Sequence, residues 1–364
     1  MNKQDTIILT LPIKPQQETN IGMMISPTIM DYIGSSLSIK KNIGFNTIHS
    51  YENKDVNLNS YLSYVNNSGI NYDSVFIDKN YSNELLNIIE KMYYDGFIKV
   101  KTKETIRCEC GRVDMLCESI NNEKLYTRQN GKIICNHCGK ECKKYQEKSL
   151  VLEIRDETII PSICPLFLEK EMKELSKNFK NSDILISKGR NTGFEIDTRE
   201  GIFNIDVDFI WSNYFNLMQE QNQIYIASNH QLFAMYFMNY LAAISSNKSL
   251  SFIANPYLNM DLKNAKNQYE KKLLKEYKAL LILYNLRWHN KNCNWSDSVA
   301  SYLNGISETK IKNLYKSMIL NASELINPDT KIEEILYILL NYNTNMQNNI
   351  KIMKKMYKGG LLWK

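Results

Sequence analysis

The sequence predicts an α/β protein in which a parallel-sheet domain is interrupted by a cysteine-rich insertion and followed by helices. Three observations support this prediction. Short apolar runs of strand character alternate with helical patterns near the start of the chain and again beyond residue 206. Six of the eight cysteines lie between Cys108 and Cys142. From Lys263 onward the apolar residues recur at helical spacing only.

The length and composition of the chain are those of a globular protein. Its 364 residues allow two or three domains, and 43% hydrophobic with 23% charged residues is an ordinary globular balance. No run approaches the roughly 20 apolar residues needed to cross a bilayer, so we expect no membrane segment. Met1 to Lys14 lacks the apolar core of a secretory signal, and we therefore expect a protein of the reducing cytoplasm.

The start of the chain predicts a strand, a helix and a second strand. Thr6–Leu11 is a short apolar run ended by Pro12, which is typical of a buried strand. Asn20–Lys41 has helical spacing and is followed by Gly44, which we expect to stop the helix. Phe45–His49 predicts the next strand. In such a unit the helix begins at the carboxyl end of a parallel sheet, where phosphates usually bind.

Later patterns extend this domain on both sides of the cysteines. A helix is expected at Asn83–Asp95, ended by Gly96. The remaining expected elements are a strand at Ser149–Ile154, a helix at Leu166–Phe179, strands at Asp206–Trp211 and Ile224–Ala227, and a helix at His230–Ala243. Because strand and helix patterns return after the cysteines, we expect the cysteine-rich region to be an insertion into one α/β domain.

The cysteines of the middle region have the spacing of a zinc knuckle. Two short pairs, each followed by a glycine, suit four thiolates around one zinc ion. The expected ligands are Cys108, Cys110, Cys135 and Cys138. The first pair is Cys-x-Cys rather than Cys-x-x-Cys, so Cys117 or Cys142 is an alternative to Cys108 or Cys110. His137 is interpreted as a bystander, and buried thiols or disulfides are the alternatives to metal.

The positive charge is concentrated in the C-terminal region. The net charge is +6, and Lys263 to Lys364 contains 17 Lys and Arg residues against 8 Asp and Glu residues. Such an excess can attract a polyanion such as RNA. A solvated helical face is the alternative interpretation.

An α/β fold that is split by a zinc-bearing insertion and followed by helices resembles a class I aminoacyl-tRNA synthetase, most closely methionyl-tRNA synthetase. The order of several local phrases supports the resemblance. Asn20-Ile-Gly-Met23 stands where the family has its HIGH motif, and Asn259–Lys263 stands where it has KMSKS. The other similar phrases are Met30–Tyr32, Gly69–Asp73, Lys91–Gly96, Ile186–Arg190, Val207–Asn213 and Asn294–Asp297.

The resemblance implies a division of the chain into four parts. Residues 1–98 would form the first half of a Rossmann-like catalytic domain, and residues 99–185 an inserted connective domain with the zinc knuckle. Residues 186–268 would form the second half of the Rossmann-like domain, and residues 269–364 a truncated, α-helical domain similar to an anticodon-binding bundle.

The resemblance also implies the site residues, but both ATP motifs are altered. Asn20 and Met23 replace the two histidines of HIGH, whereas Gly22 is kept, and one lysine of KMSKS remains as Lys263. The expected catalytic residues are Asn20, Gly22, Met23 and Lys263. The expected ATP-binding residues are Gly22, Trp211, Asn229 and His230.

The implied function is that of a methionyl-tRNA synthetase-like protein with altered ATP motifs. It would activate an amino acid as an adenylate or transfer an aminoacyl group. ATP, a methionine-like amino acid, and a tRNA or aminoacyl-tRNA bound through the basic C-terminal region would be its ligands. The alternative is a non-catalytic synthetase paralogue that binds tRNA or a protein partner.

Overall fold

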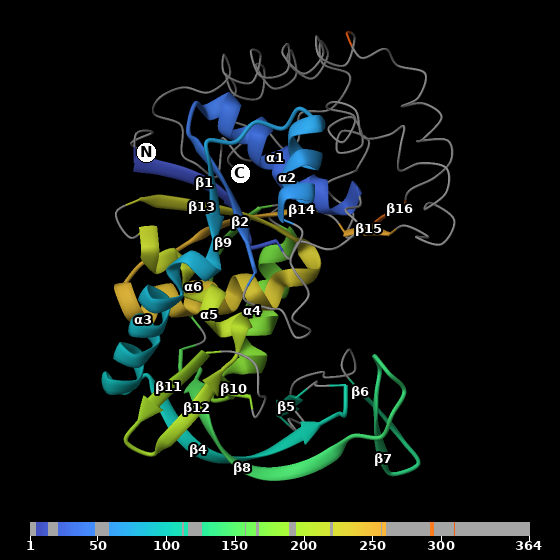
Figure 1. Cartoon of the computed structure of the whole chain (residues 1–364), viewed down its shortest axis with the longest axis vertical. Coiled ribbons are helices and arrows are strands. Elements are labelled where there is room, and N and C mark those ends of the chain that lie inside the picture. The colour runs from blue at the N-terminus through green and yellow to red at the C-terminus, as the bar shows by residue number, and fades with distance from the viewer. Residues whose placement is uncertain are drawn as a thin grey trace.

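Figure 1 shows the computed structural model of the chain. It describes residues 5–13, 21–47, 58–110, 113–115, 126–156, 158–164, 167–188, 194–218, 221–255, 257–259, 292–294 and 309. All structural statements below refer to these residues.

A six-stranded parallel sheet forms the centre of the fold. Its strands are β1 (Thr6–Thr10), β2 (Lys40–Phe45), β3 (Ser74–Ile77), β9 (Ser162–Cys164), β13 (Asn222–Ser228) and β14 (Ser251–Asn255). The strand order is β3-β2-β1-β13-β14-β9, and all neighbouring pairs are parallel. The chain order reverses at β1, which pairs with β2 on one side and with β13 on the other. The predicted Rossmann-like α/β class is therefore confirmed.

Helices cover both faces of this sheet (Figure 1). On one face, α1 (Ile21–Leu37) contacts β1, β2 and β13. The helices of the other face are α3 (Ser82–Tyr94), α4 (Phe167–Phe179), α5 (Val207–Ser212) and α6 (Leu232–Ser246). On β1, Ile8 lies beside Gly34 of α1, whereas Ile7 and Leu9 belong to the core shared with the other helices. This alternation places the sheet between two apolar layers.

A long antiparallel ribbon extends from the parallel domain and carries the cysteines (Figure 1). The strands of this sheet, in the order β10-β8-β4-β5, are β10 (Asp183–Leu185), β8 (Lys143–Glu153), β4 (Ile98–Arg107) and β5 (Val113–Met115). At its base, Ile98, Leu150 and Leu152 belong to the same core cluster as Ile7 and Leu9. The base of the ribbon is therefore continuous with the core of the parallel domain.

Three two-stranded sheets complete the described part of the chain. They are β6 (Tyr126–Gln129) with β7 (Lys132–Cys135), β11 (Phe194–Thr198) with β12 (Gly201–Ile205), and β15 (Tyr257–Asn259) with β16 (Asn292–Asn294). The first of these hairpins lies at the distal end of the ribbon and provides half of the cysteine cluster (Figure 1).

The predicted helix at Asn20–Lys41 is confirmed in type, but its predicted end is wrong. α1 ends at Leu37, and Ser38 has a φ of 54°. The next strand is Lys40–Phe45, so the strand predicted at Phe45–His49 is placed too late in the sequence. Gly44 lies inside β2 and does not stop the helix. A Cβ atom at this position would lie 3.2 Å from the carbonyl oxygen of Thr10, so glycine allows the close approach of β1 and β2.

The predicted strand at Asp206–Trp211 is wrong, because this stretch forms α5. The side chain of Asp206 is the N-cap and accepts a hydrogen bond from the N–H of Asp208 at 3.1 Å. Val207, Phe209 and Ile210 are buried on the helix. N-capping and burial of one helical face therefore outweigh the β-branched, apolar composition that predicted a strand.

The remaining expectations have separate outcomes. Residues 162–164, which the sequence places in the insertion, form β9 at the edge of the parallel sheet. Most of the predicted helical bundle at 269–364 lies outside the described residues. Within it, residues 292–294 form the strand β16 instead of a helix, and residue 309 is helical. The described helices include none with the length and hydropathy needed to span a bilayer.

Candidate functional site

The carboxyl edge of the parallel sheet, beside β1 and β13, is the candidate ligand site. Ligands of open α/β sheets bind where the strand order reverses, and β1 is that point here. α1 follows β1 and ends just before β2, so its first turn lies at the carboxyl edge. Gly22 and Met23 are in this turn, whereas Asn20 lies outside the described residues.

Two hydrogen bonds join the first turns of α1 to other elements. Oγ of Ser26 donates to Oδ1 of Asn255, at the carboxyl end of β14, over 2.9 Å. Oη of Tyr61, on α2 (Leu58–Asn67), donates to the carbonyl oxygen of Met23 over 3.0 Å. The start of α1 is therefore fixed both to the sheet edge and to a neighbouring helix.

The predicted residues Asn229 and His230 lie at the carboxyl end of β13. They form a single 3-10 turn, Asn229–Gln231, before α6, and Ser228 and Gln231 cap this turn reciprocally. His230 is exposed, and its Nδ1 lies 2.7 Å from Oγ of Ser228. The structure thus places both residues on the same edge of the sheet as the start of α1.

The carboxyl ends of β2 and β3 bury further polar groups. Asn46 is 6% exposed, and its Oδ1 has no hydrogen-bond partner among the described residues. Thr47 donates to Oδ1 of Asp78 through its N–H at 2.8 Å and through its hydroxyl at 2.7 Å. Asp78 is 1% exposed and follows β3 directly. The candidate edge is therefore polar over at least two further strands.

Trp211 and Lys263, the other two predicted site residues, make no contact with the first turn of α1 among the contacts that the structure describes. Trp211 lies on α5, packs against the core of the opposite face, and donates from Nε1 to Asp208 at 3.1 Å. Lys263 lies outside the described residues. The ATP-binding role of Trp211 and the catalytic role of Lys263 remain predictions.

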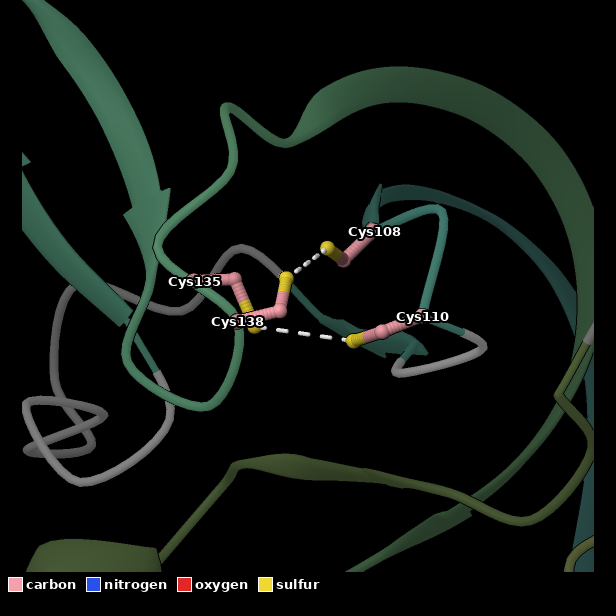
Figure 2. Close-up of side chains that lie close together, drawn as sticks. All are labelled: Cys108, Cys110, Cys135 and Cys138. Atoms are coloured by element: carbon pink, nitrogen blue, oxygen red, sulfur yellow. Dashed lines mark hydrogen bonds between the residues drawn. The ribbon is translucent and has the colours of Figure 1, made fainter.

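Four thiols converge at the far end of the ribbon (Figure 2). They belong to Cys108, Cys110, Cys135 and Cys138, and their sulfur atoms all lie within 4.8 Å of one another. The Sγ–Sγ distance is 3.3 Å between Cys108 and Cys138 and 3.7 Å between Cys110 and Cys135. Four sulfurs placed 2.3 Å from one zinc ion in a tetrahedron would be about 3.8 Å apart. The donor set and its spacing therefore fit a tetrahedral metal ion.

Backbone N–H groups at the turn after β7 favour the thiolate form of Cys135. Burial alone raises the pKa of Cys135, but its sulfur also receives hydrogen bonds from the N–H groups of Cys138 and His137 and from the thiols of Cys110 and Cys108. Together these lower its pKa to about 7. Burial raises the pKa of Cys108 well above the ordinary value. A cation among these sulfurs would favour the thiolate form of all four.

Cys142 lies beside the cluster but outside the set of four. It is half-buried and packs against Ile106, Tyr126 and Ile133. Burial raises the pKa of its thiol above the ordinary value. Cys117, the other alternative, lies outside the described residues. The structure thus brings together the four cysteines that spacing predicted.

Comparisons with known proteins bear on the fold. No model of a known protein family and no curated protein matches the sequence. A crystal structure of Mycobacterium tuberculosis methionyl-tRNA synthetase bound by methionyl-adenylate matches with a TM-score of 0.63 and 11% identity, over 86% of this chain and 71% of that chain. The apo form of that enzyme matches with a TM-score of 0.64 and 11% identity, over 98% of this chain and 81% of that chain.

The chain has the methionyl-tRNA synthetase fold. A further structure of the same M. tuberculosis enzyme, also in complex with methionyl-adenylate, matches over 96% of this chain and 79% of that chain, with a TM-score of 0.63 and 10% identity. The resemblance inferred from the order of short phrases is thereby confirmed at the level of fold. In this methionyl-tRNA synthetase fold, the sheet edge and the thiol cluster are two separate features, one in the parallel sheet and one on the ribbon.

Several residues at the sheet edge of this methionyl-tRNA synthetase fold were missed by sequence reasoning. They are Ser26, Asn46, Tyr61, Asp78 and Asn255. One usable signal was Pro27, since a proline inside a helix cannot donate the regular backbone hydrogen bond to residue 23. The others become visible only when distant segments meet, such as Ser26 and Asn255, which are 229 residues apart.

Proposed function

We propose that the carboxyl edge of the parallel sheet binds ATP and a methionine-like amino acid, or an aminoacyl donor, and that the chain is a divergent aminoacyl-adenylating or aminoacyl-transferring enzyme. The observation that carries this proposal is the fixed start of α1 at the point where the strand order reverses. Helix N-termini at such edges bind anions such as phosphates. Ser26 bonded to Asn255 holds this start against the sheet.

Within this proposal the proposed site residues have distinct roles. Gly22 lets the backbone approach the nucleotide, because it has no Cβ. Asn20 donates a hydrogen bond where the family has a histidine, whereas Met23 lacks a donor in its side chain. His230 and Asn229 contribute polar groups from the end of β13, and Lys263 provides an ammonium group for phosphate charge. The rate would be lower than with two histidines, because each lost donor at a transition-state charge costs up to about 4 kcal/mol.

A second candidate function rests on one observation. Both histidine positions of the HIGH-like phrase carry other residues, Asn20 and Met23. A non-catalytic paralogue that binds tRNA or a protein partner needs neither histidine. The basic C-terminal region, with its excess of lysine, favours tRNA as that partner.

ATP–pyrophosphate exchange with each of the twenty amino acids, methionine first, separates the two functions. The matched pair of variants is Lys263→Ala and Lys170→Ala, since Lys170 is a strongly exposed lysine on α4, 85% accessible. Exchange that is lost in Lys263→Ala and kept in Lys170→Ala is the expected result. No exchange and no transfer of an aminoacyl group from aminoacyl-tRNA, together with tight binding in a tRNA gel-shift assay, would favour the non-catalytic paralogue.

We also propose a structural zinc ion at Cys108, Cys110, Cys135 and Cys138. The fit of the four sulfurs to a tetrahedron supports this site. The zinc would close the distal end of the ribbon, where the only buried hydrophobic cluster described is that of Ile106, Tyr126 and Ile133. We further propose the domain boundaries that the sequence predicts, after residues 98, 185 and 268. The one change is that β9 (162–164) belongs to the parallel sheet and not to the inserted domain.

A further inference from the structure

We propose that Tyr61 is a positioning residue that holds the first turn of α1 in the place of a missing backbone donor. In a regular α-helix the carbonyl of Met23 accepts a hydrogen bond from the N–H of residue 27. Residue 27 is Pro27, which has no N–H and whose ring crowds the carbonyl four residues earlier. The hydroxyl of Tyr61 donates to that same carbonyl at 3.0 Å.

The packing of Tyr61 explains how its hydroxyl is held beside the carbonyl of Met23. Its side chain is 0% exposed, and its ring packs edge-on against Phe45, with centroids 5.2 Å apart and planes at 84°. Phe45 is the last residue of β2. The ring is therefore fixed between α2 and the sheet, so the hydroxyl reaches α1 without further loss of side-chain freedom.

The consequence concerns the segment Ile21–Met24, which carries the proposed site residues Gly22 and Met23. Because Pro27 removes one of the bonds that join this turn to the rest of α1, its order depends on contacts from outside the helix. Tyr61 provides one such contact from α2, and Asn255 of β14 provides another by accepting a hydrogen bond from Ser26. Ligand affinity at the sheet edge would then depend on a side chain of α2, an inference that rests on the proposed function.

Amide hydrogen exchange of the full chain tests the positioning role directly. The amides of Ile25 and Ser26 report on the first turn, because their helical acceptors are the carbonyls of residues 21 and 22. We expect Tyr61→Phe, which keeps the ring contact with Phe45, to speed their exchange roughly fivefold. In Tyr61→Phe/Pro27→Ala the N–H of the new alanine can bond to the Met23 carbonyl, so exchange should return close to that of Pro27→Ala alone.

Tyr225→Phe is the matched control. The hydroxyl of Tyr225 also makes a buried hydrogen bond, to Oε1 of Gln223 at 2.6 Å, but on β13. We expect this variant to leave exchange at Ile25 and Ser26 within twofold of the unmodified chain. Unchanged exchange in Tyr61→Phe would overturn the inference, as would a double variant that exchanges as fast as Tyr61→Phe or an equal effect from Tyr225→Phe.

Binding of a non-hydrolysable methionyl-adenylate analogue, measured by calorimetry, then separates this inference from the proposed function. We expect Tyr61→Phe to weaken binding by roughly fivefold and Pro27→Ala to restore it. If the unmodified chain binds no analogue, the proposed function fails, while the exchange data still decide whether Tyr61 holds the turn. If the analogue binds equally to all variants, the effect of Tyr61 on the site is refuted.

Discussion

Asp31 and Lys41 form an ion pair inside the parallel domain, with Nζ of Lys41 3.5 Å from Oδ1 of Asp31. Asp31 is 1% exposed and also accepts hydrogen bonds from the hydroxyl of Ser35 at 2.9 Å and from the N–H of Asn71 at 3.1 Å. The stem of Lys41 passes directly over Gly34 of α1. This one pair therefore joins α1 to β2 and to the segment before β3, and it requires a residue without a side chain at position 34.

We expect Gly34→Ala to lower the free energy of unfolding by about 1–3 kcal/mol. Helix propensity alone predicts the opposite sign, a gain of about 1 kcal/mol. Packing wins because a Cβ atom would lie 2.7 Å from Cδ of Lys41 and 3.1 Å from Cγ2 of Ile8. Urea unfolding measures the change, with Ser63→Ala on the exposed face of α2 as the control. A more stable Gly34→Ala protein would contradict this packing.

Asp183 predicts a pH dependence of stability. Its Oδ1 lies 2.7 Å from Nζ of Lys101, and its Oδ2 pairs with Lys103, so it joins β10 to β4. Burial raises the pKa of Asp183, but the hydrogen bonds and charges of the two lysines outweigh burial and lower the pKa below its ordinary value. A carboxyl group whose pKa is lower when folded stabilises above the unfolded pKa, about 3.9, and loses this effect as the pH falls through the folded value.

We therefore expect Asp183→Asn to cost about 1 kcal/mol at neutral pH, since both lysines are partly exposed. The difference from the unmodified chain should shrink below a pH of about 3.9 and continue to shrink as Asp183 is protonated. Urea unfolding of both proteins across this range measures the difference. Glu195→Gln, an exposed change on β11, is the control. A difference that stays constant with pH would show that the ion pairs do not contribute.

The parallel core could be predicted because its pattern is local. The apolar run from Ile7 to Leu9 is buried on both faces of the sheet, which is the usual character of a central parallel strand. β9 could not be predicted in the same way. It has only three residues, too few for a periodicity, and its place is determined by backbone pairing with β14. The assignment of a short strand to a sheet is therefore a tertiary property.

The two candidate sites also differ in whether local sequence or tertiary packing determines their contacts. The thiol cluster could be predicted because each pair of cysteines is close in sequence, and a turn such as Cys135–Gly139 brings sulfur and backbone N–H groups together. Sequence spacing could not decide whether Cys142 or a cysteine of the first pair is a metal ligand. At the sheet edge, Tyr61 reaches Met23 from 38 residues away, and only the packing of α2 on β2 determines that contact. Such a contact has no local sequence signal.

Substitutions at Asp206 test the helical form of α5. We expect Asp206→Ala to cost about 2 kcal/mol, because it removes both the N-cap acceptor for Asp208 and the ion pair with Lys188. Asp206→Asn keeps a cap acceptor and should cost about half as much. Thermal and urea unfolding measure both values. Equal losses in the two variants would indicate that the loss comes from the ion pair with Lys188 and that the cap does not contribute.

The zinc content of cysteine variants tests the thiol cluster. We expect the purified chain to hold about one zinc ion, Cys135→Ser to hold none, and Cys142→Ser to keep it. Cys135 is one of the four sulfurs within 4.8 Å of one another, whereas Cys142 is outside this set. Elemental analysis measures the zinc, and Cys164→Ser, a buried thiol on β9, is the control for loss of any cysteine.

Cobalt substitution makes the ligand set visible, because thiolate ligands give charge-transfer absorption that falls in proportion to the sulfurs lost. Removing the metal should loosen the distal ribbon, around Ile106 and Tyr126, without unfolding the parallel sheet, since only the base of the ribbon shares that core. Hydrogen exchange with and without a chelator measures this. Zinc retained in Cys135→Ser but lost in Cys142→Ser would replace Cys135 with Cys142 in the ligand set and contradict the geometry of the four sulfurs.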